Sequence, residues 1–159
     1  MLESLRELKS VSSHLNKASD SLTSTLTQIN DNLNKLNLGL TVWLDGPPLS
    51  SRLIEPSARY RKQHVYSVEE REILGYAKLK NGWGLAVKEV TSIHGYFEGD
   101  DNCPFTNDME GQARPLLDCS RDLRTRSVEL LPELFKLLKE KAEHLIENLD
   151  KAQSFVSEL

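Results

Sequence analysis

The 159-residue sequence predicts an α+β fold, in which two long N- and C-terminal heptad helices pair antiparallel around a small central antiparallel β-sheet. Three observations support this prediction: an apolar heptad stripe at each end of the chain, and an Asn-Gly pair between two strand-like segments in the middle. The expected boundaries are 1–37 for the first helix, 38–113 for the β-rich segment and 114–159 for the last helix, all in one folding unit.

The N-terminal stripe extends over about five heptads. From Met1 to Leu36, stripe positions alternate by four and three residues, and nine of the eleven are apolar. This is the narrow seam of a coiled coil. Ser, Thr and Asn are frequent around it, and their side chains compete for backbone hydrogen bonds, so we expect this helix to need a partner. Its predicted pairing residues are Leu8, Leu15, Leu22, Leu26, Ile29 and Leu33.

The C-terminal stripe has ten apolar residues that alternate by three and four positions from Val128 to Leu159. Proline inside a helix removes a hydrogen bond and kinks the axis, so we expect this helix to be bent or broken near Pro132. Extra leucines beside the stripe indicate contact with more than one neighbour. Pairing within one chain and pairing between two chains both remain open. The predicted pairing residues are Leu131, Phe135, Leu138, Leu145 and Leu149.

The middle of the chain is predicted to form a hairpin. Residues 72–80 and 83–90 are strand-like and flank Asn81-Gly82, which supplies the two positive-φ residues of a type I′ turn. A lone hairpin is only marginally stable in water, so we expect the helices to cover it. Residues 98–113 are predicted to be a polar loop. Antiparallel helices would bring the two termini together, with the sheet as a cap where the chain turns round.

This order of helix, sheet and helix resembles that of prefoldin-type subunits, in which N- and C-terminal coiled-coil helices flank β-hairpins that assemble into an oligomer. The resemblance concerns the layout of the whole chain. It implies a holding chaperone that works as an oligomer.

Composition limits the classes of partner. The net charge is −4 and no half of the chain is a basic arm, which disfavours nucleic acid because phosphate contacts need a cationic face. Cys103 and Cys119 form no CxxC pair and are expected to be free thiols in a reducing compartment. No apolar run approaches the ~18 residues of a membrane span, and the N-terminus lacks an apolar signal region, so we expect a cytoplasmic protein without a membrane partner.

Motifs for chemistry are scarce. The sequence contains no dinucleotide-binding, P-loop, zincin or nucleophile-elbow motif. We therefore predict no catalytic, cofactor-binding or metal-binding residues, and an enzyme is the least favoured class. The acidic stretch 98–102 has no EF-hand spacing and is interpreted as a solvated loop. A candidate anion-binding cluster, which the nearby acidic stretch 69–72 would balance, consists of Arg59, Arg61, Lys62 and His64.

The leading hypothesis is a non-enzymatic interaction or scaffold protein that assembles through its helices. Its expected partner is itself, as a homo-oligomer, or another protein. The alternative is a binding module that holds a peptide or an anionic ligand through the central sheet and its loops, with the helices as a stalk.

Overall fold

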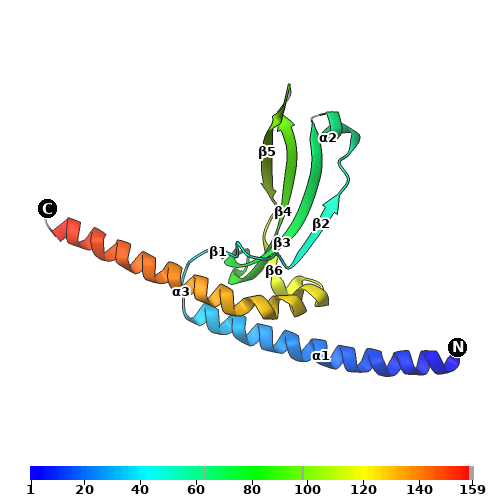
Figure 1. Ribbon diagram of the computed structural model, residues 1–159. Helices are drawn as coiled ribbons and strands as arrows, with labels where there is room; N and C mark the ends of the chain where they lie inside the picture. The colour runs from blue at the N-terminus through cyan, green and yellow to red at the C-terminus, as the bar shows by residue number, and fades with distance from the viewer. Residues whose placement is uncertain (63, 98, 158–159) are drawn as a thin grey trace.

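The computed structural model describes residues 1–62, 64–97 and 99–157, with backbone only at residues 60, 62 and 100–102. It confirms the α+β class: two long helices flank a curled antiparallel sheet (Figure 1). In chain order the elements are α1 (Leu2–Lys35), β1 (Val42–Trp43), β2 (Ser50–Ile54), α2 (Ala58–Lys62), β3 (Val65–Leu79), β4 (Gly82–Phe97), β5 (Asp100–Glu110), β6 (Arg114–Pro115), the 3-10 helix η1 (Leu116–Asp118) and α3 (Arg121–Ser157).

The sheet is built on the long pair β3 and β4. Its strand order is β1-β3-β4-β5; β2 also pairs with β3, and β6 also pairs with β4. All five pairings are antiparallel. The end of the sheet nearest β1 and β6 lies on the helices, while β2, β5 and the far ends of β3 and β4 project away from them as an arm (Figure 1).

The two helices run in the same direction, so the predicted antiparallel pairing is wrong. Arg121 near the start of α3 donates to Asn16 Oδ1 at 2.9 Å, and Arg124 donates to Thr23 Oγ1 at 2.6 Å. Both residue numbers rise together along the pair, and the two termini lie at opposite ends of the molecule (Figure 1). The reason is that β6 and η1 return the chain beside the middle of α1. The layout resemblance to prefoldin-type subunits, which depends on antiparallel helices, does not extend to this arrangement.

The turn between β3 and β4 lies one residue earlier than the predicted turn at Asn81-Gly82. Leu79 is opposite Gly82, so the two loop residues are Lys80 and Asn81. Gly82 has a φ of 121°, but Asn81 is not among the residues with positive φ. The predicted type I′ turn at Asn81-Gly82 is therefore not formed.

Two other segments differ from expectation. Residues 98–113, predicted as a loop, contain the eleven-residue strand β5, which pairs with β4 along the arm. Helix α3 begins at Arg121 and continues through Pro132 to Ser157, so the helix is not interrupted at this proline.

The main core lies between the helices and the nearer end of the sheet. Leu26 of α1, Leu74 of β3 and Leu134 of α3 are fully buried within it. A second, smaller cluster in the arm contains Val65, Val68 and Ile93. The main core between the helices and the nearer end of the sheet therefore provides most of the hydrophobic stabilisation.

Gly75 allows β1 to lie against β3. A Cβ atom at this position would be 2.3 Å from Cε3 of Trp43 and 2.4 Å from the carbonyl oxygen of Val42. The Trp43 ring continues over Lys88, whose Nζ is 4.7 Å from the ring centroid. Only glycine fits at position 75 without displacing this ring.

Candidate interaction surfaces

The predicted helix-pairing residues separate into an inner and an outer group. The inner group packs in the main core: Leu26, Leu33, Leu131 and Leu138 are buried, and Leu22 and Ile29 are partly buried. These residues pack with strands of the sheet as well as with the other helix. The outer group is exposed and consists of Leu8, Leu15, Phe135, Leu145 and Leu149.

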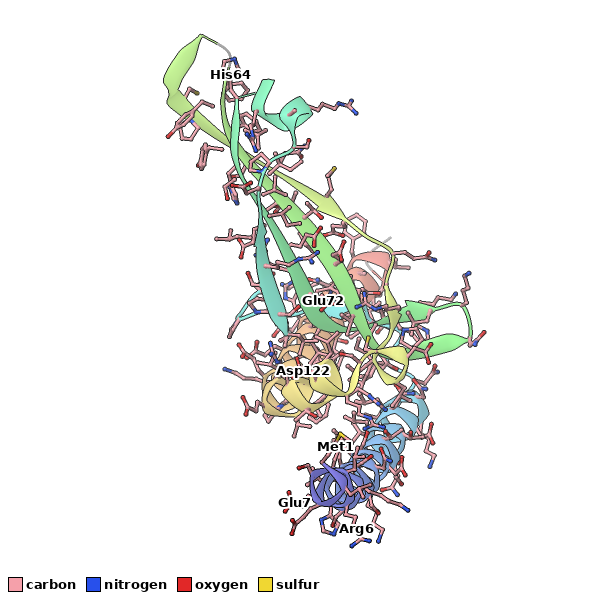
Figure 2. The ribbon with its side chains drawn as sticks, turned by 90° about the vertical axis from the view of Figure 1, so that its right-hand side faces the viewer. Met1, Arg6, Glu7, His64, Glu72 and Asp122 are labelled. Carbon is pink, nitrogen blue, oxygen red and sulfur yellow. The ribbon has the colours of Figure 1, made fainter. Side chains whose placement is uncertain are left out.

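The outer half of α1, residues 2–18, extends past the start of α3. Every residue in it is exposed, including Leu5, Leu8 and Leu15 on the apolar stripe. Figure 2 looks along this helix and shows Met1, Arg6 and Glu7 at its free end, away from the sheet. The stripe therefore continues beyond the point where the chain itself supplies a covering surface.

The outer half of α3, residues 139–157, extends past the other end of α1. Every residue in it except Ala142 is exposed. Its stripe contains Leu145, Leu149 and Val156, and Ile146 and Phe155 widen the stripe. Ile146, Phe155 and Val156 are more than half exposed. The molecule thus has two apolar helix faces that project in opposite directions (Figure 1).

The accessible area is large for a chain of this mass. The structure exposes 11337 Å². A compact monomer of 18.0 kDa would expose about 8,000 Å². The difference is roughly 3,000 Å², whereas a standard protein interface covers about 800 Å² per partner. The projecting helices and the sheet arm both contribute to this difference.

Three of the predicted anion-binding residues, Arg59, Arg61 and Lys62, lie in α2, and His64 follows shortly after it. Arg59 and Arg61 are exposed, and the side chain of Lys62 lies outside the described residues. Arg61 Nε donates to the carbonyl oxygen of Pro56 at 3.0 Å, and its Nη2 is 3.9 Å from Glu55. His64, which has a φ of 59°, lies at the far tip of the sheet (Figure 2).

The acidic stretch 69–72 pairs elsewhere. Glu69 accepts a hydrogen bond from Ser51, Glu70 forms an ion pair with Arg52, and Glu72 binds both Ser50 and Arg114. Antiparallel pairing of β2 with β3 brings these groups together. The expected neutralisation of residues 59–64 by this stretch is therefore not what the structure shows.

A polar network that includes buried Ser92 crosses the sheet arm. Arg71 on β3 donates to the hydroxyl oxygen of Ser92 at 2.9 Å, and Ser92 donates to Asp108 on β5 at 2.6 Å. Ser92 is 2% exposed. Further along the same two strands, buried Lys88 of β4 donates to Glu110 of β5 at 2.7 Å. These contacts attach the polar strand β5 to the sheet.

The described residues contain no group of three or more His, Cys, Asp or Glu that could hold a metal ion. The side chains of Glu98, Asp100, Asp101 and Asn102 lie outside them. Cys103 is exposed and Cys119 is buried, and burial raises the pKa of the Cys119 thiol. Among the helices that the structure describes, none combines the length and apolarity needed to cross a membrane.

Sequence reasoning missed Asn30 and Asn34 of α1. Asn30 Oδ1 accepts a hydrogen bond from the backbone N–H of Leu85 at 2.8 Å, and Asn34 Oδ1 accepts one from the hydroxyl of Tyr76 at 3.0 Å. Their spacing of four residues places them on one helix face, which was the available indication of a joint role.

Comparison with protein-family models, with curated proteins and with solved structures gives no match to this chain.

Proposed function

We propose that this protein is a self-assembling scaffold or interaction protein in which a second copy covers the outer halves of α1 and α3. The excess of accessible area over that of a compact monomer carries the proposal. An interface of standard size requires only part of that excess.

The outer half of α1 would gain stability from packing against a partner. In proteins most of the stability of a helix comes from packing of its apolar face, and the apolar stripe of residues 2–18 is exposed. Residues 2–18 contain four serines and an asparagine, which are weaker helix formers. Packing of the stripe against another helix would supply the stabilisation that local propensity lacks.

A second copy is a suitable occupant because the same chain contains both complementary faces. Residues 2–18 contain two acids and three bases, for a net charge of +1, and residues 139–157 contain four acids and three bases, for a net charge of −1. Like-charge repulsion therefore does not oppose contact between the two halves.

The direction of the helices supports a head-to-tail arrangement. Because α1 and α3 are parallel and offset, a copy displaced along the helix axis would place its outer α3 half beside the outer α1 half of the first copy. This contact would repeat the parallel pairing that already exists within the chain. A head-to-tail contact forms a ring if the rotation closes, and a filament if it does not.

Complementation between two variants tests both the assembly and its arrangement. Leu8→Glu/Leu15→Glu changes only the α1 face, and Leu145→Glu/Leu149→Glu changes only the α3 face. We expect the unaltered chain to have a concentration-dependent mass above 18.0 kDa by sedimentation. Each variant alone should be monomeric, while an equimolar mixture should form a dimer from the two unaltered faces.

The control is Ser10→Glu/Ser13→Glu, which adds the same charge to the opposite side of the outer α1 half and should leave assembly unchanged. An unaltered chain that stays monomeric at micromolar concentration would contradict self-assembly. A mixture that stays monomeric, or a single variant that still dimerises, would contradict the head-to-tail arrangement.

The alternative binding module at residues 59–64 has weaker support. Arg61 already contacts Pro56 and Glu55. It remains a proposal that replacement of Arg59 and Arg61 by Ala would test through loss of anion binding with no change of oligomeric state.

A further inference from the structure

An open groove of about 730 Å³ lies between α1, the hairpin end of β4 and the segment 112–118. It is separate from the outer helix halves and from the residues 59–64. We refer to it as the β4-edge groove, because residues Gly82–Leu85 of β4 form one of its walls.

Among the described residues, no strand pairs with the edge of β4 that borders this groove. β6 pairs with β4 only at Ala86 and Val87, and after Pro115 the chain turns into η1. In place of a strand, Asn30 Oδ1 accepts a hydrogen bond from the backbone N–H of Leu85 at 2.8 Å. Backbone groups on one edge of an antiparallel strand repeat every two residues, so those of Trp83 are directed to the same side.

Gly84 makes this edge accessible to an approaching polar group. A Cβ atom at this position would be 2.9 Å from Asn30 Oδ1. An unpaired edge of this kind is a template for an added strand. The side-chain amide of Asn30 occupies one of the positions that a strand would fill.

The rim of the groove is cationic in a chain whose net charge is −4. Lys78, Lys80 and Arg114 line it, against one acid, Asp118. Arg114 is held by Glu72. Within the described ranges, Lys78 and Lys80 are exposed and take part in no ion pair.

An aromatic platform adjoins the strand edge. Trp83 is partly buried and stacks on Tyr76, with ring centroids 5.8 Å apart. Trp83 lines both the groove and a neighbouring cavity of about 220 Å³. An apolar side chain of a bound segment would find a surface there.

We propose that the β4-edge groove binds an extended acidic peptide segment whose backbone pairs with that of Trp83 on β4. Main-chain hydrogen bonds to the edge would supply affinity, as in other cases of strand addition. Lys78 and Lys80 would select carboxylate side chains on one face of the bound segment.

The test uses the full-length protein and a fluorescein-labelled hexapeptide of alternating Glu and Val, with anisotropy as the readout. We expect saturable binding, and slower hydrogen exchange at the Trp83 amide when the peptide is bound. Lys78→Glu/Lys80→Glu should weaken binding by about tenfold or more, because two attractions become repulsions. Lys136→Glu, a charge change outside the groove and outside both outer helix halves, should leave binding unchanged.

Two control peptides separate the parts of the proposal. Alternating Lys and Val should bind at least tenfold more weakly, and a Glu-Val peptide with alternate backbone nitrogens methylated should lose the protection of Trp83. Equal binding of the Lys-Val peptide, no effect of the Lys78/Lys80 variant, or no saturable binding would overturn the proposal. Lys78 and Lys80 lie outside the helix halves, so these outcomes are independent of self-assembly.

Discussion

Leu8 and Leu26 lie on the same apolar stripe of α1, yet Leu26 is 0% exposed and Leu8 is 63% exposed. The heptad pattern gives both positions the same role, but in the structure Leu26 is buried and Leu8 is exposed. The difference arises because α3 begins beside the middle of α1.

This contrast predicts different effects of the same substitution. Leu26→Ala should lower the free energy of unfolding by about 2–5 kcal/mol, because it leaves a cavity in the main core. Leu8→Ala should change it by less than about 0.5 kcal/mol in dilute solution, where the helix half is not covered. Urea denaturation of the two variants at submicromolar concentration measures both effects. A loss at Leu8 as large as that at Leu26 would mean that the chain covers this residue itself.

Replacement of Gly75 by alanine should destabilise the fold. The added Cβ would collide with the Trp43 ring and the Val42 carbonyl oxygen, and relief of such overpacking costs about 1–3 kcal/mol. Thermal unfolding should show a clear decrease in Tm. Gly46→Ala is a suitable control, because a Cβ there would make only ordinary contacts at 3.7 Å or more with Glu133. Equal Tm values for the two variants would show that β1 does not lie against β3 as described.

Ser92→Ala should weaken the sheet arm. The hydroxyl joins Arg71 to Asp108, and its loss leaves a partly buried guanidinium with one partner fewer, at a cost of about 1–3 kcal/mol. Denaturant unfolding measures the loss. Thr106→Ala, which removes an exposed contact to His94 in the same part of the sheet, should cost less than about 1 kcal/mol. The account of the network fails if the order of the two effects is reversed.

Stability should decrease at alkaline pH. Burial raises the pKa of the Cys119 thiol and of the Tyr76 phenol above their ordinary values. In the unfolded chain these groups ionise near pH ~8.5 and ~10, while in the folded chain they stay neutral to higher pH. Their contribution is therefore complete at neutral pH and is lost as pH rises through this range.

The measurement is the free energy of unfolding of the unaltered chain and of Cys119→Ala/Tyr76→Phe between about pH 7 and pH 11. The double variant should be the less stable protein at neutral pH, and the gap should narrow as pH rises. A gap that stays constant would contradict the inferred pKa shifts.

The heptad stripes predict where helices form but not how they are oriented. A stripe with spacings of three and four has the same pattern in either chain direction. The spacing therefore gave no basis for predicting that the two helices would be antiparallel. The stripe also cannot show where its cover ends. That is why Leu8 and Leu26 were grouped together, although only Leu26 is buried.

Strand β5 was hidden by its composition. It is an edge strand whose described side chains are mostly exposed, so it lacks the alternation of apolar and polar residues that marks a half-buried strand. Backbone pairing with β4 and the contacts of Asp108 and Glu110 hold it in place. Such contacts depend on partners distant in sequence. The same holds for Asn30, whose partner Leu85 lies 55 residues away.

The central claim is that a second copy covers the outer helix halves, and hydrogen exchange at two protein concentrations tests it most directly. Amides in residues 2–18 and 139–157 should exchange slowly at high concentration and rapidly after dilution, while the amides around Leu26 and Leu134 stay slow at both. Exchange in the outer halves that does not depend on concentration would contradict the claim.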